Sequence, residues 1–109
     1  MSKKRIPKKL KNKIYEYIQI LKKDKLPIKK VVLFGSRAKG TQNKWSDVDL
    51  CIISPKFKNA FDALQYLSSK VIFDMKYTIE PIGFSPEDFK DKYSSLIYEI
   101  KTTGIEILV

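Results

Sequence analysis

The chain has 109 residues, no histidine and a single cysteine, Cys51. Without histidine, catalytic triads that depend on an imidazole base are excluded, and so are the usual zinc sites of histidine and cysteine. One cysteine cannot form a disulfide within the chain, which is typical of a protein in a reducing, cytoplasmic setting. Acid–base or metal chemistry must come from other side chains, and oxygen ligands favour hard cations such as Mg²⁺.

Long apolar runs are also missing. No segment is long enough to cross a bilayer, so no membrane association is expected, and the basic start lacks the apolar stretch of a secretory signal. Hydrophobic residues nevertheless make up 43% of the chain, which is enough for a core. The length predicts a single domain over residues 1–109, with a basic and flexible segment at residues 1–6.

Positive charge is concentrated at the start of the chain. The formal net charge is +10, and residues 1–30 contain twelve of the 22 lysines and arginines against only Glu16 and Asp24. Such a segment predicts an anionic partner, which could be nucleic acid, an acidic protein or phosphates. The alternative is a lysine-rich helix face that only aids solubility. No groove-reading motif is present, so sequence-specific binding to DNA is disfavoured.

Hydrophobic periodicity predicts an alternation of helices and strands. Helices are expected over residues 7–24, 59–70 and 85–103, and strands over 28–34, 47–53, 76–83 and 105–109. This order predicts an α+β fold, a mixed sheet of about four strands with helices packed on it. The expected core-facing positions of the helices are Leu10, Ile14, Tyr17, Ile18 and Leu21, then Phe61, Leu64 and Leu67, and finally Phe89, Tyr93, Leu96 and Ile100.

The strand at 28–34 runs directly into Gly35 and Ser36. Glycine at a strand exit lets backbone amides approach a ligand closely, which is what holding a phosphate requires. Ser36 would add a hydroxyl donor and Arg37 a positive charge. Strand–Gly–Ser turns are common, however, so an ordinary turn is the alternative.

Asp47 and Asp49 stand at the start of the next predicted strand. Positions i and i+2 of a strand point to the same face, so the two carboxylates should project side by side. Their mutual repulsion is relieved by a cation between them, and Mg²⁺ fits beside a phosphate-holding turn. The alternative is a pair of ordinary surface acids, but the turn and the acids should meet at one end of the sheet, which favours a site.

Together, Gly35-Ser36 and Asp47-Val48-Asp49 resemble the signature of the polymerase-beta-like nucleotidyltransferase superfamily. The longer runs, 34–40 and 46–50, are similar to the minimal nucleotidyltransferase family of small prokaryotic stand-alone domains. The resemblance implies the polymerase-beta-like fold, a Gly-Ser turn that holds a nucleoside triphosphate, and aspartates that bind two Mg²⁺ ions.

The resemblance also implies a third acid on a neighbouring strand, which helps to bind the second ion and activates the attacking hydroxyl. Glu80 is the candidate, because it lies between apolar residues on the third predicted strand. Pro81 follows it and cannot donate to a sheet ladder, so a bend or an end of the strand there is the alternative. Asp74 is a rival third acid, although it precedes the strand.

The implied activity is Mg²⁺-dependent transfer of a nucleoside monophosphate, with ATP the expected donor, to an acceptor hydroxyl, the reaction type of EC class 2.7.7. The family often pairs with all-helical HEPN-domain proteins, and the acceptor would be a tyrosine of such a partner, for which the transferase acts as antitoxin. The alternative is a catalytically weak subunit that binds a nucleotide or partner and acts by contact alone. The sequence leaves the oligomeric state open.

Overall fold

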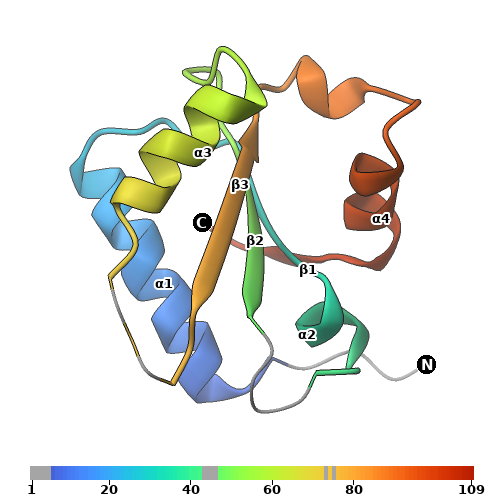
Figure 1. Cartoon of the computed structure of the whole chain (residues 1–109). Coiled ribbons are helices and arrows are strands. Elements are labelled where there is room, and N and C mark those ends of the chain that lie inside the picture. Colours follow the sequence, from blue (N-terminus) through green and yellow to red (C-terminus); the bar gives the residue numbers. More distant parts are fainter. Residues whose placement is uncertain (1–5, 43–46, 73, 75) are drawn as a thin grey trace.

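A mixed four-stranded sheet lies at the centre of the fold, in the order β3-β2-β1-β4 (Figure 1). The computed structural model describes residues 6–42, 47–72, 74 and 76–109, so nearly all of the basic segment predicted at 1–6 lies outside the described residues, as does Ser46. β2 and β3 are parallel, whereas β1 is antiparallel to β2 and β4. The elements in chain order are α1 (Lys8–Lys23), β1 (Lys30–Phe34), α2 (Ser36–Lys39), β2 (Val48–Ile53), α3 (Ala60–Ser69), β3 (Ile79–Phe84), the 3-10 turn η1 (Asp88–Lys90), α4 (Ser95–Thr103) and β4 (Ile105–Ile107). The predicted α+β fold is confirmed.

The two faces of the sheet bury separate cores. On one face, α1 and α3 pack against residues such as Leu33 and Leu50. On the other face, Ile100 of α4 packs with Phe34 and Cys51 in a smaller cluster. The alternation of side chains along each strand produces this division. The apolar stripe predicted for α1 is confirmed, because all five of its residues are buried. Among the described residues, no helix is long and apolar enough to span a membrane.

The apolar face predicted for α3 is wrong in part. Phe61 and Leu64 are 65% and 43% exposed, and only Ala63 and Leu67 of this helix are buried. The reason is the close approach of α3 to β3 at Gly83, where an added Cβ would lie 2.9 Å from side-chain atoms of both Ala63 and Leu67. Because α3 lies so close to β3, the side chains of Ala63 and Leu67 are enough to cover the strand here.

The single helix predicted from Ser85 to residue 103 is also wrong, because the segment divides into η1 and α4. The Ser85 hydroxyl does accept a hydrogen bond from the Asp88 backbone amide at 3.0 Å, as its capping role predicts. Asp91 then turns to an extended conformation and ends η1. A second cap at Ser94, whose hydroxyl accepts from the Ile97 amide at 3.1 Å, begins α4. Tyr93 lies between η1 and α4 and is 96% exposed, and Leu96 in the first turn of α4 is exposed as well.

β3 continues through Pro81, so the alternative of a strand end at this residue is wrong. β3 is an edge strand, paired only with β2. The carbonyls of Thr78 and Phe84 accept hydrogen bonds from Val48 and Ser54 across this pair. Because the bonding direction alternates along a strand, the nitrogen of Pro81 faces the free edge, where no donor is needed.

Candidate functional site

One row of the sheet register brings the predicted residues together. Phe34, the last residue of β1, lies opposite Asp49 of β2, and Asp49 lies opposite Glu80 of β3. Neighbouring residues in register have their side chains on the same face, so the carboxylates of Asp49 and Glu80 lie side by side. The chain leaves β1 at Phe34 and enters the Gly35-Ser36 turn at this same end of the sheet, where α2 lies (Figure 1).

Gly35 is in direct contact with Asp49. Its backbone has φ 75° and ψ −156°, a conformation that is essentially restricted to glycine. A Cβ atom at this position would lie 2.2 Å from the Asp49 Oδ2 atom, well inside van der Waals contact. The Gly35 carbonyl accepts hydrogen bonds from the Ala38 and Lys39 amides, both at 3.1 Å, and so closes the short helix α2 behind it. Glycine therefore allows the turn to lie against the carboxylate.

Ser36 and Arg37 follow as the first two residues of α2, and both are half-buried. The Arg37 guanidinium lies over the ring of Tyr77, 5.2 Å from its centroid, in the segment that leads into β3. The two residues thus lie beside Gly35, and Arg37 also contacts the segment that precedes β3. Their contact with a phosphate stays a prediction.

The acids of the site repel one another. Partial burial raises the pKa of Asp49 above its ordinary value, and the negative charges of Asp47 and Glu99 raise it further. The pKa of Glu80 is raised by partial burial first, then by hydrogen bonding to Asp47 and by the charges of Asp47 and Asp49. Asp47 itself is exposed and directly precedes β2.

The donor set of the site fits a hard divalent cation, because carboxylates that raise one another's pKa are stabilised in their ionised form by positive charge. Within the described ranges, no three acidic or cysteine side chains are close enough together to form a complete ligand set. An ion would therefore have to draw the carboxylates of Asp47, Asp49 and Glu80 closer together.

Glu99 of α4 is a further charged residue at this site, and sequence reasoning missed it. Its carboxylate lies 3.3 Å from the ammonium of Lys39, the last residue of α2. Its charge also reaches Asp49, as the raised pKa of that group indicates. Glu99 comes 50 positions after Asp49, and no local sequence pattern distinguishes it from other helix acids. Only the packing of α4 on the sheet brings it to the turn.

The rival third acid, Asp74, has a different environment. Its carboxylate forms an ion pair with Lys13 of α1, at 2.6 Å, and accepts hydrogen bonds from the Lys76 and Tyr77 amides. These contacts lower its pKa to about 2, the Lys13 bond being the largest cause. Asp74 fastens the segment before β3 to α1, and Glu80 remains the candidate third acid.

Comparisons with known proteins bear on the family and on the fold. The family model described as nucleotidyltransferase domain matches residues 14–107. No curated protein is significantly similar in sequence. Among solved structures, a Sulfolobus solfataricus protein provisionally assigned as a nucleotidyltransferase superposes with a TM-score of 0.64 at 17% identity, over 90% of this chain and 78% of the other.

Two toxin–antitoxin structures are also similar. One was solved with AMP-PNP and superposes with a TM-score of 0.56 at 23% identity. The other is a mutant of the pair MntA–HpeT, with a TM-score of 0.53 at 19% identity. Each match covers 88% of this chain and 70% of the other. At these identities the likeness shows the fold.

Proposed function

The chain belongs to the nucleotidyltransferase domain family, and we propose that it transfers a nucleoside monophosphate from a nucleoside triphosphate to an acceptor hydroxyl. The observation that carries the proposal is the contact of Gly35 with Asp49 in the same register row as Glu80. A turn that can hold phosphates and acids that a cation would stabilise in their ionised form then lie at one end of the sheet.

The residues have distinct roles in this proposal. Gly35 and Ser36 hold the terminal phosphates of the donor, with Arg37 supplying positive charge beside them. Asp47, Asp49 and Glu80 are the residues that would hold Mg²⁺. Bound there, the metal would neutralise the triphosphate and stabilise the charge that develops on the transferred phosphoryl group.

The transfer itself is an in-line displacement. The acceptor oxygen forms a bond to the α-phosphorus while the bond from that phosphorus to the bridging oxygen breaks, and pyrophosphate leaves. Glu80 takes the proton of the attacking hydroxyl. Its place beside Asp49 in the sheet register supports this role.

We propose ATP as the donor and a protein hydroxyl as the acceptor. Toxin–antitoxin pairs among the structural relatives support a protein partner, and one of them was solved with AMP-PNP, an ATP analogue. A tyrosine of a HEPN-domain protein is the acceptor that the sequence resemblance implies. The alternative, a subunit acting by contact alone, would be favoured if Glu80 pointed away from the two aspartates, but its register with Asp49 supports the catalytic alternative.

The test uses ATP labelled at the α-phosphate, with Mg²⁺ and the proteins encoded beside this chain as acceptors. The wild type should transfer label, and the double variant Asp47→Asn/Asp49→Asn should lose it. Glu87→Gln/Asp88→Asn is the matched control, because it removes two exposed acids in and next to η1 and should retain transfer. Undiminished transfer by the Asp47→Asn/Asp49→Asn variant would reject the assignment.

A further inference from the structure

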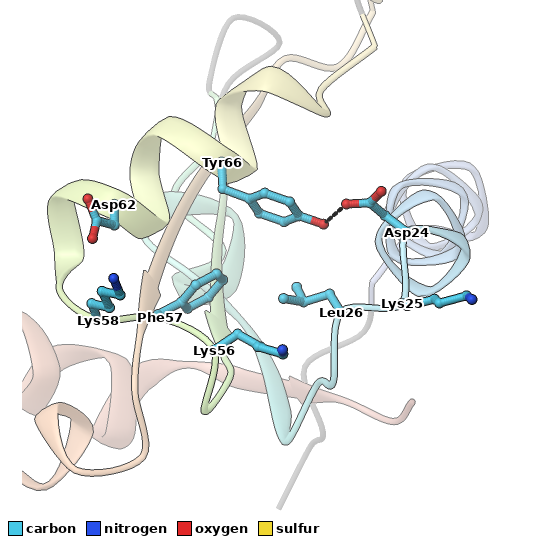
Figure 2. Close-up of a pocket in the computed structure, with 8 residues that line it drawn as sticks. All are labelled: Asp24, Lys25, Leu26, Lys56, Phe57, Lys58, Asp62 and Tyr66. Atoms are coloured by element: carbon cyan, nitrogen blue, oxygen red, sulfur yellow. Dashed lines mark hydrogen bonds between the residues drawn. The ribbon is translucent and has the colours of Figure 1, made fainter.

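A cavity of about 430 Å³ lies at the opposite end of the sheet from the acids (Figure 2). Its walls come from the end of α1, from the loop that follows β2 and from α3. Four residues of β2 follow Asp49, so the end of the strand beside the cavity lies roughly 13 Å from Asp49 at the usual rise of a strand. Its volume lies within the usual range of small-molecule pockets, about 300–1,000 Å³.

The apolar walls of this cavity are held in place. Leu26 follows α1 in a helix-ending turn, in which its amide bonds the Leu21 carbonyl at 3.1 Å. Phe57 is buried, and its ring lies 6.3 Å from that of Tyr66. The hydroxyl of Tyr66 donates a hydrogen bond to Asp24, which fastens α3 to the end of α1, as Figure 2 shows. Leu26 and Tyr66 therefore form a preformed apolar wall that buried Phe57 supports, and the Lys70 ammonium lies over the Tyr66 ring, 5.7 Å from its centroid.

Three lysines and two aspartates line the cavity. Lys56 and Lys58 flank Phe57 in the loop after β2, and both are exposed. The charge of Asp24 is already engaged by Tyr66 and by the Lys70 ammonium at 3.6 Å. Asp62 also lines the cavity and offsets part of the lysine charge, while providing an acceptor for an amino group. The combination suits a ligand with an anionic end and a planar end.

We propose that this cavity is a second nucleotide site, which binds a nucleoside monophosphate with its base against Tyr66 and Leu26 and its phosphate at Lys56 and Lys58. Base–aromatic stacking and lysine–phosphate attraction are the two interactions that such a ligand requires. The site is separate from the proposed transfer centre and does not depend on it.

The test is titration of the protein with AMP, followed by amide resonances in ¹H–¹⁵N spectra. AMP should shift resonances of residues 24–26 and 56–66, and it should do so equally in the Asp47→Asn/Asp49→Asn variant. Lys56→Gln/Lys58→Gln should raise the Kd for AMP about tenfold, since exposed ion pairs each contribute a modest amount. Lys8→Gln, at the far end of α1, is the control and should leave the Kd unchanged.

Adenosine and inorganic phosphate are the two comparison probes, and each should bind about tenfold more weakly than AMP. Shifts confined to residues 35–39 and 47–49 would overturn the proposal, and so would the absence of shifts. An unchanged Kd in Lys56→Gln/Lys58→Gln, or phosphate binding as tight as that of AMP, would also overturn it. The amide spectrum of each variant without ligand shows whether it is folded. Because AMP should bind equally well to Asp47→Asn/Asp49→Asn, this result is separate from the test of the proposed transfer.

Discussion

Gly35 concentrates two requirements in one residue, a positive φ and the absence of a Cβ next to Asp49. Gly35→Ala should place a methyl group 2.2 Å from the Asp49 Oδ2 atom and force alanine into a conformation reserved for glycine. We expect a cost of about 1–3 kcal/mol in the free energy of unfolding. Transfer activity should fall by about a hundredfold or more, since a displacement near 1 Å at a reaction centre has effects of this size.

Denaturant unfolding and label transfer measure the two effects of Gly35→Ala separately. Gly40→Ala is the comparison, because Gly40 also has a positive φ, 80°, but nothing lies within 4 Å of its Cβ position. Gly40→Ala should therefore lose stability while largely retaining the site. Equal activity losses in the two variants would contradict a specific role for the contact with Asp49.

In the proposed complex, Glu99 would compete with the triphosphate for the charge of Lys39, which lies beside the Gly35-Ser36 turn. Glu99→Gln breaks the 3.3 Å ion pair and removes a negative charge that acts on Asp49. The KM for the donor nucleotide should then fall about two- to fivefold, the range expected for a partly exposed pair. Steady-state transfer kinetics provide the measurement, with Glu87→Gln as the control at an exposed acid next to η1. A KM that stays unchanged in Glu99→Gln would remove Glu99 from the site.

At the scale of elements, Asp74 connects the approach to β3 with α1. The pKa of Asp74 in the folded state is about 2, below its ordinary value of 3.8. The ion pair with Lys13 therefore stabilises the fold fully at pH values above 3.8. This stabilisation is lost as the pH falls toward the folded pKa. Asp74→Asn should therefore lower the Tm at pH 7, and its Tm should converge on that of the wild type near pH 2.

The pH dependence distinguishes this contact from simple loss of packing. Asp62→Asn removes an aspartate for which no such ion pair occurs among the described residues, so it serves as the control. A Tm difference that persists unchanged at pH 2 for Asp74→Asn would show that the carboxylate acts through shape or neutral hydrogen bonds instead of charge.

The elements also show what the sequence could and could not predict. The stripe of α1 was predictable because Leu10 to Leu21 repeat at helical spacing and pack on one broad face. The break between η1 and α4 was not, since the caps at Ser85 and Ser94 compete locally and only tertiary packing decides between them. The same distinction applies to the site. Glu80 was predicted from the family resemblance, and the parallel register of β2 and β3 places it opposite Asp49, whereas Glu99 arrives through the docking of a distant helix.

At the scale of the whole molecule, the acids and the proposed second site lie at opposite ends of the sheet. The acids gather where β2 and β3 begin, and the proposed second site lies beyond the end of β2. The lysines of α1 mostly face outward, as a solubilising face would, but Lys13 is an exception because it pairs with Asp74 and Glu16. A partner attracted by the net charge of +10 would therefore meet the outer face of α1 without disturbing the sheet.

Cys51 reports on the integrity of the whole sheet. It is fully buried in the middle of β2, paired with Val32 and Ile82 on the two neighbouring strands, and burial raises the pKa of its thiol to about 12. A thiol reagent at pH 8 needs the exposed thiolate, so labelling should require opening of the smaller core, in which Cys51 packs with Ile100 of α4. For a domain of ordinary stability, labelling should be at least about a thousandfold slower than for a free thiol.

The labelling rate should rise with denaturant at the slope of global unfolding, because the same surface must be exposed in both processes. Cys51→Ala/Lys8→Cys provides the free-thiol rate in the same fold, since Lys8 is exposed at the start of α1. Rapid labelling of Cys51 without denaturant would mean that α4 leaves the smaller core on its own. In that case Glu99 would leave the turn together with α4, and its effect on the donor KM would depend on this local opening.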